Sequence, residues 1–186
     1  MAVLRYNHNM EIVKSPLQEL ELVPPDVERD APISLGWLEG DEGRNTLRLM
    51  GNTDEHNNPS TLEEEKKRVQ DFIESKDQLT WMIKLQDKIV GCVWVNLESS
   101  EYLPGPSLHI MIGDPSSRGH GVGINATKTV IKYLKASGNY EKLYTRHLVN
   151  NKAAISLLRG IGFEELGEAY KDSDGLGWQN EQMNLT

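Results

Sequence analysis

Hydrophobic and polar positions along the chain follow two periods, one typical of strands and one typical of helices. Seven segments are rich in β-branched and aromatic residues or alternate apolar with polar residues, which predicts strands. These segments are residues 10–23, 79–85, 89–97, 108–112, 142–149, 163–169 and 177–185. The first is interrupted at Pro16, because proline cannot donate a hydrogen bond within a sheet.

Four other segments place apolar residues three and four positions apart, which predicts helices. They lie within residues 33–51, 60–75, 122–137 and 151–162, and the first holds one or two short helices because glycines interrupt it. Ser60 and Glu63 have the spacing of a capping box. Asn151 is placed to cap the last helix and Gly162 to end it.

The order of these elements predicts one mixed sheet with helices between its strands. Residues 79–97 form an antiparallel hairpin, and Gly91 in its second strand indicates a bulge or a close backbone approach. No internal repeat and no linker rich in proline, glycine or serine divides the chain. We therefore expect a single domain that spans residues 1–186.

Composition narrows the classes of function. The chain is 38% hydrophobic and 26% charged, and no apolar run approaches the roughly 18 residues that cross a bilayer. The first residues hold no apolar stretch typical of a secretory signal, so we expect a cytoplasmic protein. The single cysteine, Cys92, excludes an internal disulfide and predicts an inert core thiol in an apolar strand. No metal is expected.

The formal net charge of −8 argues against nucleic acid and against an anionic membrane as partners, because binding phosphates needs clustered Lys and Arg. Residues 39–65 hold eight acids and two bases. One interpretation is a solvated helical face. The other is a field that concentrates a cationic substrate.

Residues 109–134 (HIMIGDPSSRGHGVGINATKTVIKYL) predict a strand, a short turn and a helix. Gly121 and Gly123 lack side chains that would keep a ligand away from the backbone. The helix that follows presents free N–H groups and the positive end of its dipole to an anion, and Arg118 adds a positive charge. The segment predicts a diphosphate site, and a tight strand-to-helix connection without a ligand is the alternative.

Two common phosphate loops do not fit this turn. A P-loop needs Gly-Lys-Ser/Thr, which is absent. A dinucleotide-binding fingerprint needs a third glycine at a different spacing and an acid at the end of the next strand. Residues 119–123 (GHGVG) lack that spacing, and residues 143–149 (LYTRHLV) carry no acid.

A second segment, NKAAISLLRGIGF at residues 151–163, follows the predicted helix and strand. Together the two segments resemble the GNAT superfamily of N-acetyltransferases, whose pattern is strand, R/Q-x-x-G-x-G/A, helix, strand, N-x-x-A, helix, G-F. The hairpin around Gly91 is similar to that family's second and third strands. The N-terminal part is loosely similar to the branch with ribosomal-protein, aminoglycoside 6′ and polyamine acetyltransferases. The resemblance implies an α+β fold: a mixed, mostly antiparallel sheet of six to seven strands flanked by about four helices.

The resemblance also implies acetyl-CoA as co-substrate. Backbone groups of Met111 and Ile112 would bind the pantetheine arm where the sheet opens, and Asn151 would contact the cofactor from the later helix. The pyrophosphate would lie on Arg118, Gly119, His120, Gly121, Val122 and Gly123. The alternatives are that Met111 and Ile112 are ordinary core residues and that Asn151 is only a helix cap.

Acetyl transfer from a thioester to an amine uses a base for the amine and a proton donor for the leaving sulfur. The tyrosine that many family members place in the later helix corresponds to Leu158 here, so the usual donor is missing. Ser156 and Tyr144 are the nearby candidates for a substitute.

The base is also displaced, because the glutamate of many relatives corresponds to Ser107. His109 lies inside the central strand and is the candidate base near its ordinary pKa of about 6.5, with a hydrogen-bonded structural histidine as the alternative. Glu98 and Glu101 are further candidates, and His147 is a weaker one.

These residues predict an N-acetyltransferase that moves an acetyl group from acetyl-CoA directly to a primary amine, on a cationic small molecule or a protein. The first alternative is an acyl-CoA-binding module of the same fold with little catalysis. The second is an α/β protein that binds another nucleotide. The C-terminal strand, residues 177–185, is a candidate edge strand that would pair in a homodimer.

Overall fold

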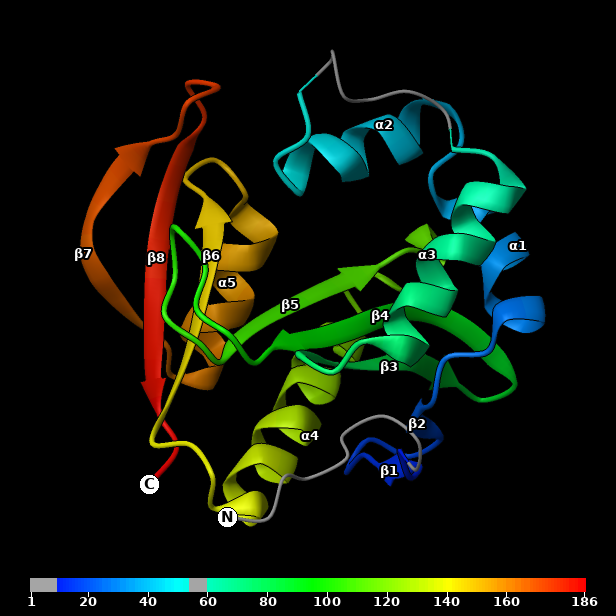
Figure 1. Ribbon diagram of the computed structural model, residues 1–186, viewed down its shortest axis with the longest axis horizontal. Helices are drawn as coiled ribbons and strands as arrows, with labels where there is room; N and C mark the ends of the chain where they lie inside the picture. The colour runs from blue at the N-terminus through cyan, green and yellow to red at the C-terminus, as the bar shows by residue number, and fades with distance from the viewer. Residues whose placement is uncertain (1–9, 54–59) are drawn as a thin grey trace.

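One eight-stranded sheet runs through the molecule, with strand order β1-β2-β3-β4-β5-β6-β8-β7 (Figure 1). The computed structural model describes residues 10–53 and 60–186. The strands are β1 (Val13–Lys14), β2 (Leu20–Val23), β3 (Gln78–Leu85), β4 (Lys88–Asn96), β5 (Ser107–Ile112), β6 (Lys142–Leu148), β7 (Glu164–Lys171) and β8 (Gly177–Asn184). Neighbouring strands pair antiparallel except β5 and β6, which are parallel. The expected α+β class with a mixed, mostly antiparallel sheet is confirmed.

The described residues form five α-helices and a short 3-10 turn. They are α1 (Val27–Trp37), α2 (Gly40–Leu49), α3 (Leu62–Glu74), η2 (Pro115–Ser117), α4 (Val122–Ser137) and α5 (Lys152–Ile161). None of these helices has the length and apolar character needed to cross a membrane.

The sequence underestimated the number of elements and shifted some boundaries. The segment around Pro16 divides into two strands, β1 and β2, so the sheet has eight strands rather than six or seven. α1 begins well before the predicted segment, because Asp26 caps it by accepting a hydrogen bond from the N–H of Arg29. α3 has its capping box at Thr61 and Glu64, one residue after the predicted Ser60 and Glu63.

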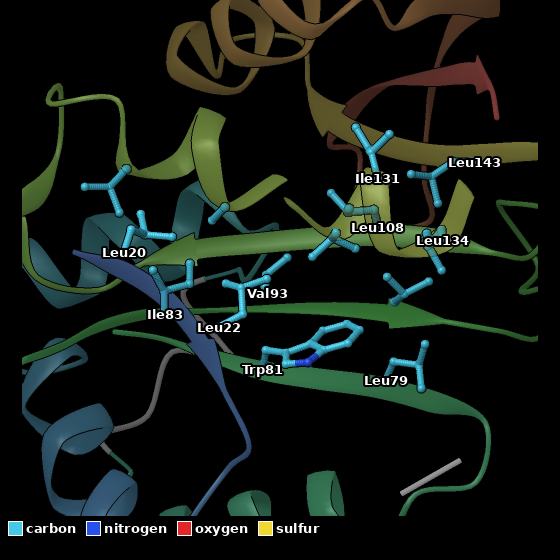
Figure 2. Packing of buried hydrophobic residues seen from close by; sticks show 14 of the residues in the cluster. Leu20, Leu22, Leu79, Trp81, Ile83, Val93, Leu108, Ile131, Leu134 and Leu143 are labelled. Atoms are coloured by element: carbon cyan, nitrogen blue, oxygen red, sulfur yellow. The ribbon is translucent and has the colours of Figure 1, made fainter. Parts of the chain in front are cut away.

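One face of the sheet carries the larger core, beneath α4 and α5 (Figure 2). Trp81, Ile83 and Val93 from the sheet pack there with Ile131 and Leu134 of α4. Each is buried, and burying an aliphatic side chain of this size contributes roughly 1.5–3 kcal/mol. This core fixes α4 against the central strands.

The opposite face is covered by α1 and α3, which pack on each other. Its smaller core includes Trp37, Met82 and Met111, together with Cys92. Burial raises the pKa of the Cys92 thiol to about 12, which agrees with an inert core cysteine. Gly91 lies against β5 so closely that a β-carbon would be 2.3 Å from the carbonyl oxygen of Met111. β3 and β4 also shift register beside Gly91, as predicted.

Candidate active site

The sheet opens between β5 and β6. The two parallel strands share a single register pair, Ser107 with Tyr144. Next to it, the Thr145 hydroxyl donates to the carbonyl oxygen of Leu108 at 2.8 Å, and beyond this point no strand pairing is present. β5 continues towards α3 while β6 runs beside α5 (Figure 1). The edge of β5 that faces the opening therefore has backbone groups free to bind an extended ligand.

α4 begins at the wide end of this opening with an uncapped N-terminus. Its N-cap is Gly121, with φ of +78°, and no side chain of the described residues caps the helix. Gly119 also has a positive φ of +77°, so the turn depends on glycine at both positions. The Asn125 side chain instead donates to the carbonyl oxygen of Gly121 at 2.9 Å, which holds the turn. The first N–H groups of this 16-residue helix thus receive no side-chain cap from the described residues, an arrangement that binds anions.

Gly123 has a packing role that the sequence did not indicate. A β-carbon there would lie 3.0 Å from Cδ1 of Leu157 and 3.7 Å from Cγ1 of Ile112. The absence of a side chain at Gly123 therefore allows α4, α5 and β5 to approach one another. Val122 beside it is buried, whereas Gly119 and His120 are exposed.

The Arg118 side chain is bound to other protein groups, and its role as a charge-assisted phosphate ligand stays a prediction. Its Nε donates to the carbonyl oxygen of Ile112 at 2.9 Å, and Nη2 donates to the carbonyl oxygen of Gly113 at 3.2 Å and to the Thr46 hydroxyl at 3.0 Å. A weak ion pair to Glu42, 3.5 Å long, completes the set. The guanidinium is thus bound to protein, and it ties the end of β5 to α2.

The residues predicted to bind the pantetheine arm, Met111 and Ile112, lie at the opening, but one of their backbone groups is already used. Met111 is buried and Ile112 half-buried at the free end of β5. The Ile112 carbonyl oxygen already accepts from Arg118, so its N–H and the groups of Met111 are the remaining candidates. Asn151 caps α5 by accepting from the N–H of Ala154 at 3.1 Å, and its Nδ2 donates to the carbonyl oxygen of Leu49 at the end of α2. Asn151 is therefore a helix cap, and its contact with the cofactor stays a prediction.

The candidate proton donors are separated by the structure. Leu158 is buried in the larger core. Ser156 is exposed on α5, two positions from Leu158 and therefore on the opposite side of the helix, and its role as a substitute for the missing tyrosine stays a prediction. Tyr144 lies at the narrow end of the opening, on the same face of the sheet as His109, because Tyr144 pairs with Ser107 and side chains alternate along a strand.

His109 is held by its neighbours as the structural alternative predicts. Its ring stacks on Trp94 with centroids 5.3 Å apart, and Nε2 lies 3.3 Å from both the Asn96 amide nitrogen and the Ser107 hydroxyl. An amide nitrogen only donates, so Nε2 accepts and the neutral ring carries its proton on Nδ1. Burial, and then the charge of Arg146, lowers the His109 pKa to about 4. The expected pKa near 6.5 is therefore wrong, and His109 is a weaker base than expected.

This pKa predicts a specific pH dependence of stability. Between pH 6.5 and 4 the unfolded chain binds a proton at His109 and the folded chain does not, so the stabilisation is complete above pH 6.5 and is lost as pH falls towards 4. Over this pH range we expect the free energy of unfolding of His109→Gln to fall by about 2–3 kcal/mol less than that of the wild type. Chemical denaturation of both proteins at several pH values measures it. Parallel curves for the two proteins would contradict the lowered pKa.

The two glutamates that are further candidates for the base lie on the surface, and their role stays a prediction. Glu98 and Glu101 are exposed.

In the acidic segment, residues 39–65, Asp41 pairs with Arg44, Glu42 with Arg118, and Glu64 caps α3. The buried Glu65 pairs with Arg68 and accepts from the hydroxyls of Ser34 and Ser60. These contacts favour structural use over a field for cationic substrates, and Asp54 and Glu55 lie outside the described residues. Among the described residues no cluster suits a metal ion.

Sequence reasoning missed a buried polar pair behind the opening. His147 and Glu181 are 6% and 2% exposed, with Nε2 and Oε1 3.1 Å apart. His147 Nδ1 lies 2.9 Å from the carbonyl oxygen of Leu148. Both ring nitrogens thus face acceptors, so one proton must lie between the imidazole and the carboxylate. The pairing of β6 with β8, which brings them together, is not visible in the local sequence.

A second missed cluster lies where α2 spans the ends of β5 and β6 (Figure 1). Arg146 of β6 lies between the rings of Tyr102 and Trp178, with its Cζ 4.5 Å and 4.1 Å from their centroids. The end of α2 contacts Trp178 closely, because a β-carbon on Gly51 would lie 2.5 Å from this ring. The strand 177–185 that contributes Trp178 is β8, which lies between β6 and β7. It is not an edge strand, so the predicted route to a homodimer is wrong.

Comparison with known proteins agrees with this geometry. The profile of the acetyltransferase (GNAT) domain matches residues 19–164. The alpha/beta-tubulin-N-acetyltransferase 9 of Drosophila melanogaster is 24% identical over 188 residues, covering 88% of this chain and 90% of that protein. RimL, a ribosomal-protein alpha-N-acetyltransferase solved with coenzyme A, has a TM-score of 0.76 at 17% identity, covering 94% of this chain and 98% of that chain. Spermidine N-acetyltransferase from Vibrio cholerae, solved with CoA and spermine, has a TM-score of 0.70 at 17% identity. The match covers 90% of this chain and 96% of that chain. This chain belongs to the GNAT acetyltransferase family.

Proposed function

We propose that this protein transfers the acetyl group of acetyl-CoA directly to an α-amine, in a ternary complex of both substrates. Two observations carry the proposal: the pairing of β5 with β6 ends after Ser107 and Tyr144, and α4 begins without a side-chain cap. Backbone N–H groups of residues 119–123 would hold the pyrophosphate, with φ of +78° at Gly121 shaping the turn. The pantetheine arm would follow Met111 and the N–H of Ile112 along β5. The carbonyl polarisation that transfer requires would come from a backbone N–H of the same edge.

The nature of the amine follows from the missing base. With its pKa lowered to about 4, His109 is a weak proton acceptor, and Nε2 already accepts from Asn96. The acceptor must therefore supply its own neutral amine. An α-amino group has a pKa of about 7.7–8.0 and is about one-tenth neutral at pH 7, whereas an amine with a pKa near 10.4 is neutral in fewer than about one molecule in a thousand. This difference favours α-amines over lysine side chains and polyamines.

Protonation of the leaving thiolate requires less help from the protein than deprotonation of the amine. Its pKa of about 8.5 lies about 1.5 units above neutral, so a missing proton donor costs roughly 2 kcal/mol. Tyr144 is the hydroxyl that we propose for this role, because it lies on the same face as His109 at the narrow end of the opening. Leu158 fills the usual position with a buried apolar side chain.

Two matched peptides test the proposal. One has a free α-amine and no lysine, and the other has a blocked N-terminus and one lysine. At pH 7.5 we expect the first to accelerate CoA release at least about tenfold more than the second, from the neutral fractions above. We also expect kcat/KM to rise with pH through the pKa of the acceptor's own amine. Release of free thiol, followed spectroscopically, measures both.

The second candidate function is an acyl-CoA-binding module with little catalysis, which the buried Leu158 and the weak base at His109 favour. It predicts that acetyl-CoA raises the melting temperature while no amine accelerates CoA release. At 100 times Kd, bound acetyl-CoA adds about 2.7 kcal/mol of stability in either case. The absence of any stabilisation would contradict both functions.

A further inference from the structure

We propose that Arg146 binds a carboxylate of the acceptor, so that the substrate is an α-amine carried on an acidic peptide or an amino acid. The proposal rests on the proposed function, because it concerns the second substrate of the same site. It assigns a specificity role to a residue of β6 that no sequence motif indicated.

Arg146 is the arginine of the site that lacks an acidic partner. Five other arginines each pair with a carboxylate: Arg29 with Asp30, Arg44 with Asp41, Arg68 with Glu65, Arg118 with Glu42 and Arg159 with Glu165. In the described ranges Arg146 forms no ion pair, although the chain carries a net charge of −8. Its one hydrogen bond is from Nη1 to the Tyr170 hydroxyl, 3.2 Å long. The Asp172 carboxylate is within electrostatic reach: burial raises its pKa, but hydrogen bonds, one of them from the Trp178 indole, and then the charge of Arg146 lower it. It does not contact the guanidinium as an ion pair, and a half-buried guanidinium without direct carboxylate contact is a ready site for an anion.

The surrounding groups fix the guanidinium and leave its edge available. Tyr102 and Trp178 lie against it, which covers its apolar faces. The polar atoms of these neighbours are already used: Tyr170 donates to Asn180, Asn180 donates to the carbonyl oxygen of Tyr102, and the Trp178 indole donates to Asp172. A guanidinium carries five N–H donors, so most remain for an in-plane carboxylate.

The position of Arg146 matches the acceptor side of the opening. It follows Tyr144 by two residues on β6 and therefore shares its face of the sheet with Tyr144 and His109. Its charge contributes, after burial, to the lowered pKa of His109, which places the two groups within electrostatic reach. The connection between β4 and β5, which contains Tyr102, lies beside β6 and β8 (Figure 1). The same positive charge disfavours polyamines and other cations.

A purely structural role is the competing explanation, in which Arg146 only joins β6 to Tyr102 and Trp178. In that case substitution lowers stability and affects every acceptor equally. A carboxylate-binding role instead changes the preference among acceptors. Selectivity, not total activity, therefore separates the two.

The test uses the full chain with acetyl-CoA and C-terminally amidated peptides that share an N-terminal serine and differ in having glutamate or lysine at the next two positions. A free amino acid tests whether the carboxylate can be part of the amine-bearing residue, and spermidine is the cationic acceptor. We expect the wild type to prefer the acidic peptide over the basic one by at least about tenfold in kcat/KM. Arg146→Gln should reduce that preference by about 10- to 100-fold, the size of one or two charge-assisted hydrogen bonds, with the Kd of acetyl-CoA unchanged.

Two further variants keep the test decisive. Arg146→Lys retains the charge without the planar fork and should keep part of the preference. Arg159→Gln, on the exposed surface of α5, should leave the preference intact. Equal or better use of the basic peptide or spermidine by the wild type would overturn the proposal, as would an equal loss for both peptides in Arg146→Gln.

If no amine is acetylated at all, the proposed function fails independently of Arg146. Calorimetric binding of the two peptides to the acetyl-CoA complex then decides the question. Stronger binding of the acidic peptide that disappears in Arg146→Gln would support the carboxylate site. Equal binding would remove it.

Discussion

Gly121→Glu is expected to lower the affinity for acetyl-CoA by at least about 100-fold, equivalent to about 2.7 kcal/mol. Two effects combine at this position. Gly121 has φ of +78°, so a side chain strains the turn at the N-cap of α4. The added carboxylate would also lie beside the N–H groups that are to bind the pyrophosphate, and the repulsion between like charges increases where water is excluded. Calorimetric titration with acetyl-CoA measures the loss.

The matched control is Gly138→Glu at the other end of the same helix. Gly138 also has a left-handed backbone, with φ of +64°, and a β-carbon there meets no atom within 4 Å. This variant should lose some stability from strain but keep its affinity for acetyl-CoA. Retained affinity in Gly121→Glu would show that the turn does not hold the pyrophosphate.

Glu181→Ala is expected to reduce the free energy of unfolding by about 3 kcal/mol, because removing one member of a buried pair leaves the other without its partner. His147 and Glu181 are nearly inaccessible, so water cannot replace the lost hydrogen bond. For a chain of this size the loss corresponds to a fall of about 6–12 °C in Tm. Thermal and chemical denaturation measure it.

Glu165→Ala makes the same change in an exposed pair. Glu165 lies 3.4 Å from Arg159, and both side chains are more than half exposed, at 59% and 69%. Pairs of this kind contribute about 0–1 kcal/mol, so this variant should unfold almost as the wild type does. Similar small losses in both variants would contradict a role for the buried pair in holding β6 to β8.

Local patterns in the sequence predicted the central elements because those elements depend on local rules. The strand before the glycine turn, α4 and α5 follow from apolar spacing and from caps such as Asn151 and Gly162. Gly121 was correctly placed at the start of α4 because few other residues adopt its backbone conformation. The family resemblance then depended on the spacing of these same short segments.

The other elements and contacts depend on pairing between distant parts of the chain, which the sequence does not show. The strand 177–185 was expected at an edge, but it pairs with β6 and β7 on its two sides, and no local pattern distinguishes an inner strand from an edge strand. Arg118 was assigned to phosphate from its charge in the turn, and its contacts with Thr46 and Glu42 of α2, more than 70 positions earlier, were not foreseen. A charge in a turn does not reveal its partner.

The electrostatics of the site were also outside the reach of sequence patterns. The lowered pKa of His109 results from burial and from Arg146 on the neighbouring strand. The rings of two residues lie against Arg146: Tyr102 from the connection between β4 and β5, and Trp178 from β8. Only the folded chain brings these groups together, and they are the basis for proposing an α-amine within the expected class of primary amines on cationic small molecules or proteins.

The most direct test of the account is the position of the acetyl group on a peptide that offers both kinds of amine. The substrate has a free N-terminal serine, an acidic second residue and one internal lysine, and it is incubated with the full chain and acetyl-CoA at pH 7.5. Tandem mass spectrometry then locates the added acetyl group. The structure predicts acetylation of the α-amine with the lysine unmodified. Acetylation of the lysine alone, or a peptide left unmodified while acetyl-CoA binds, would contradict it.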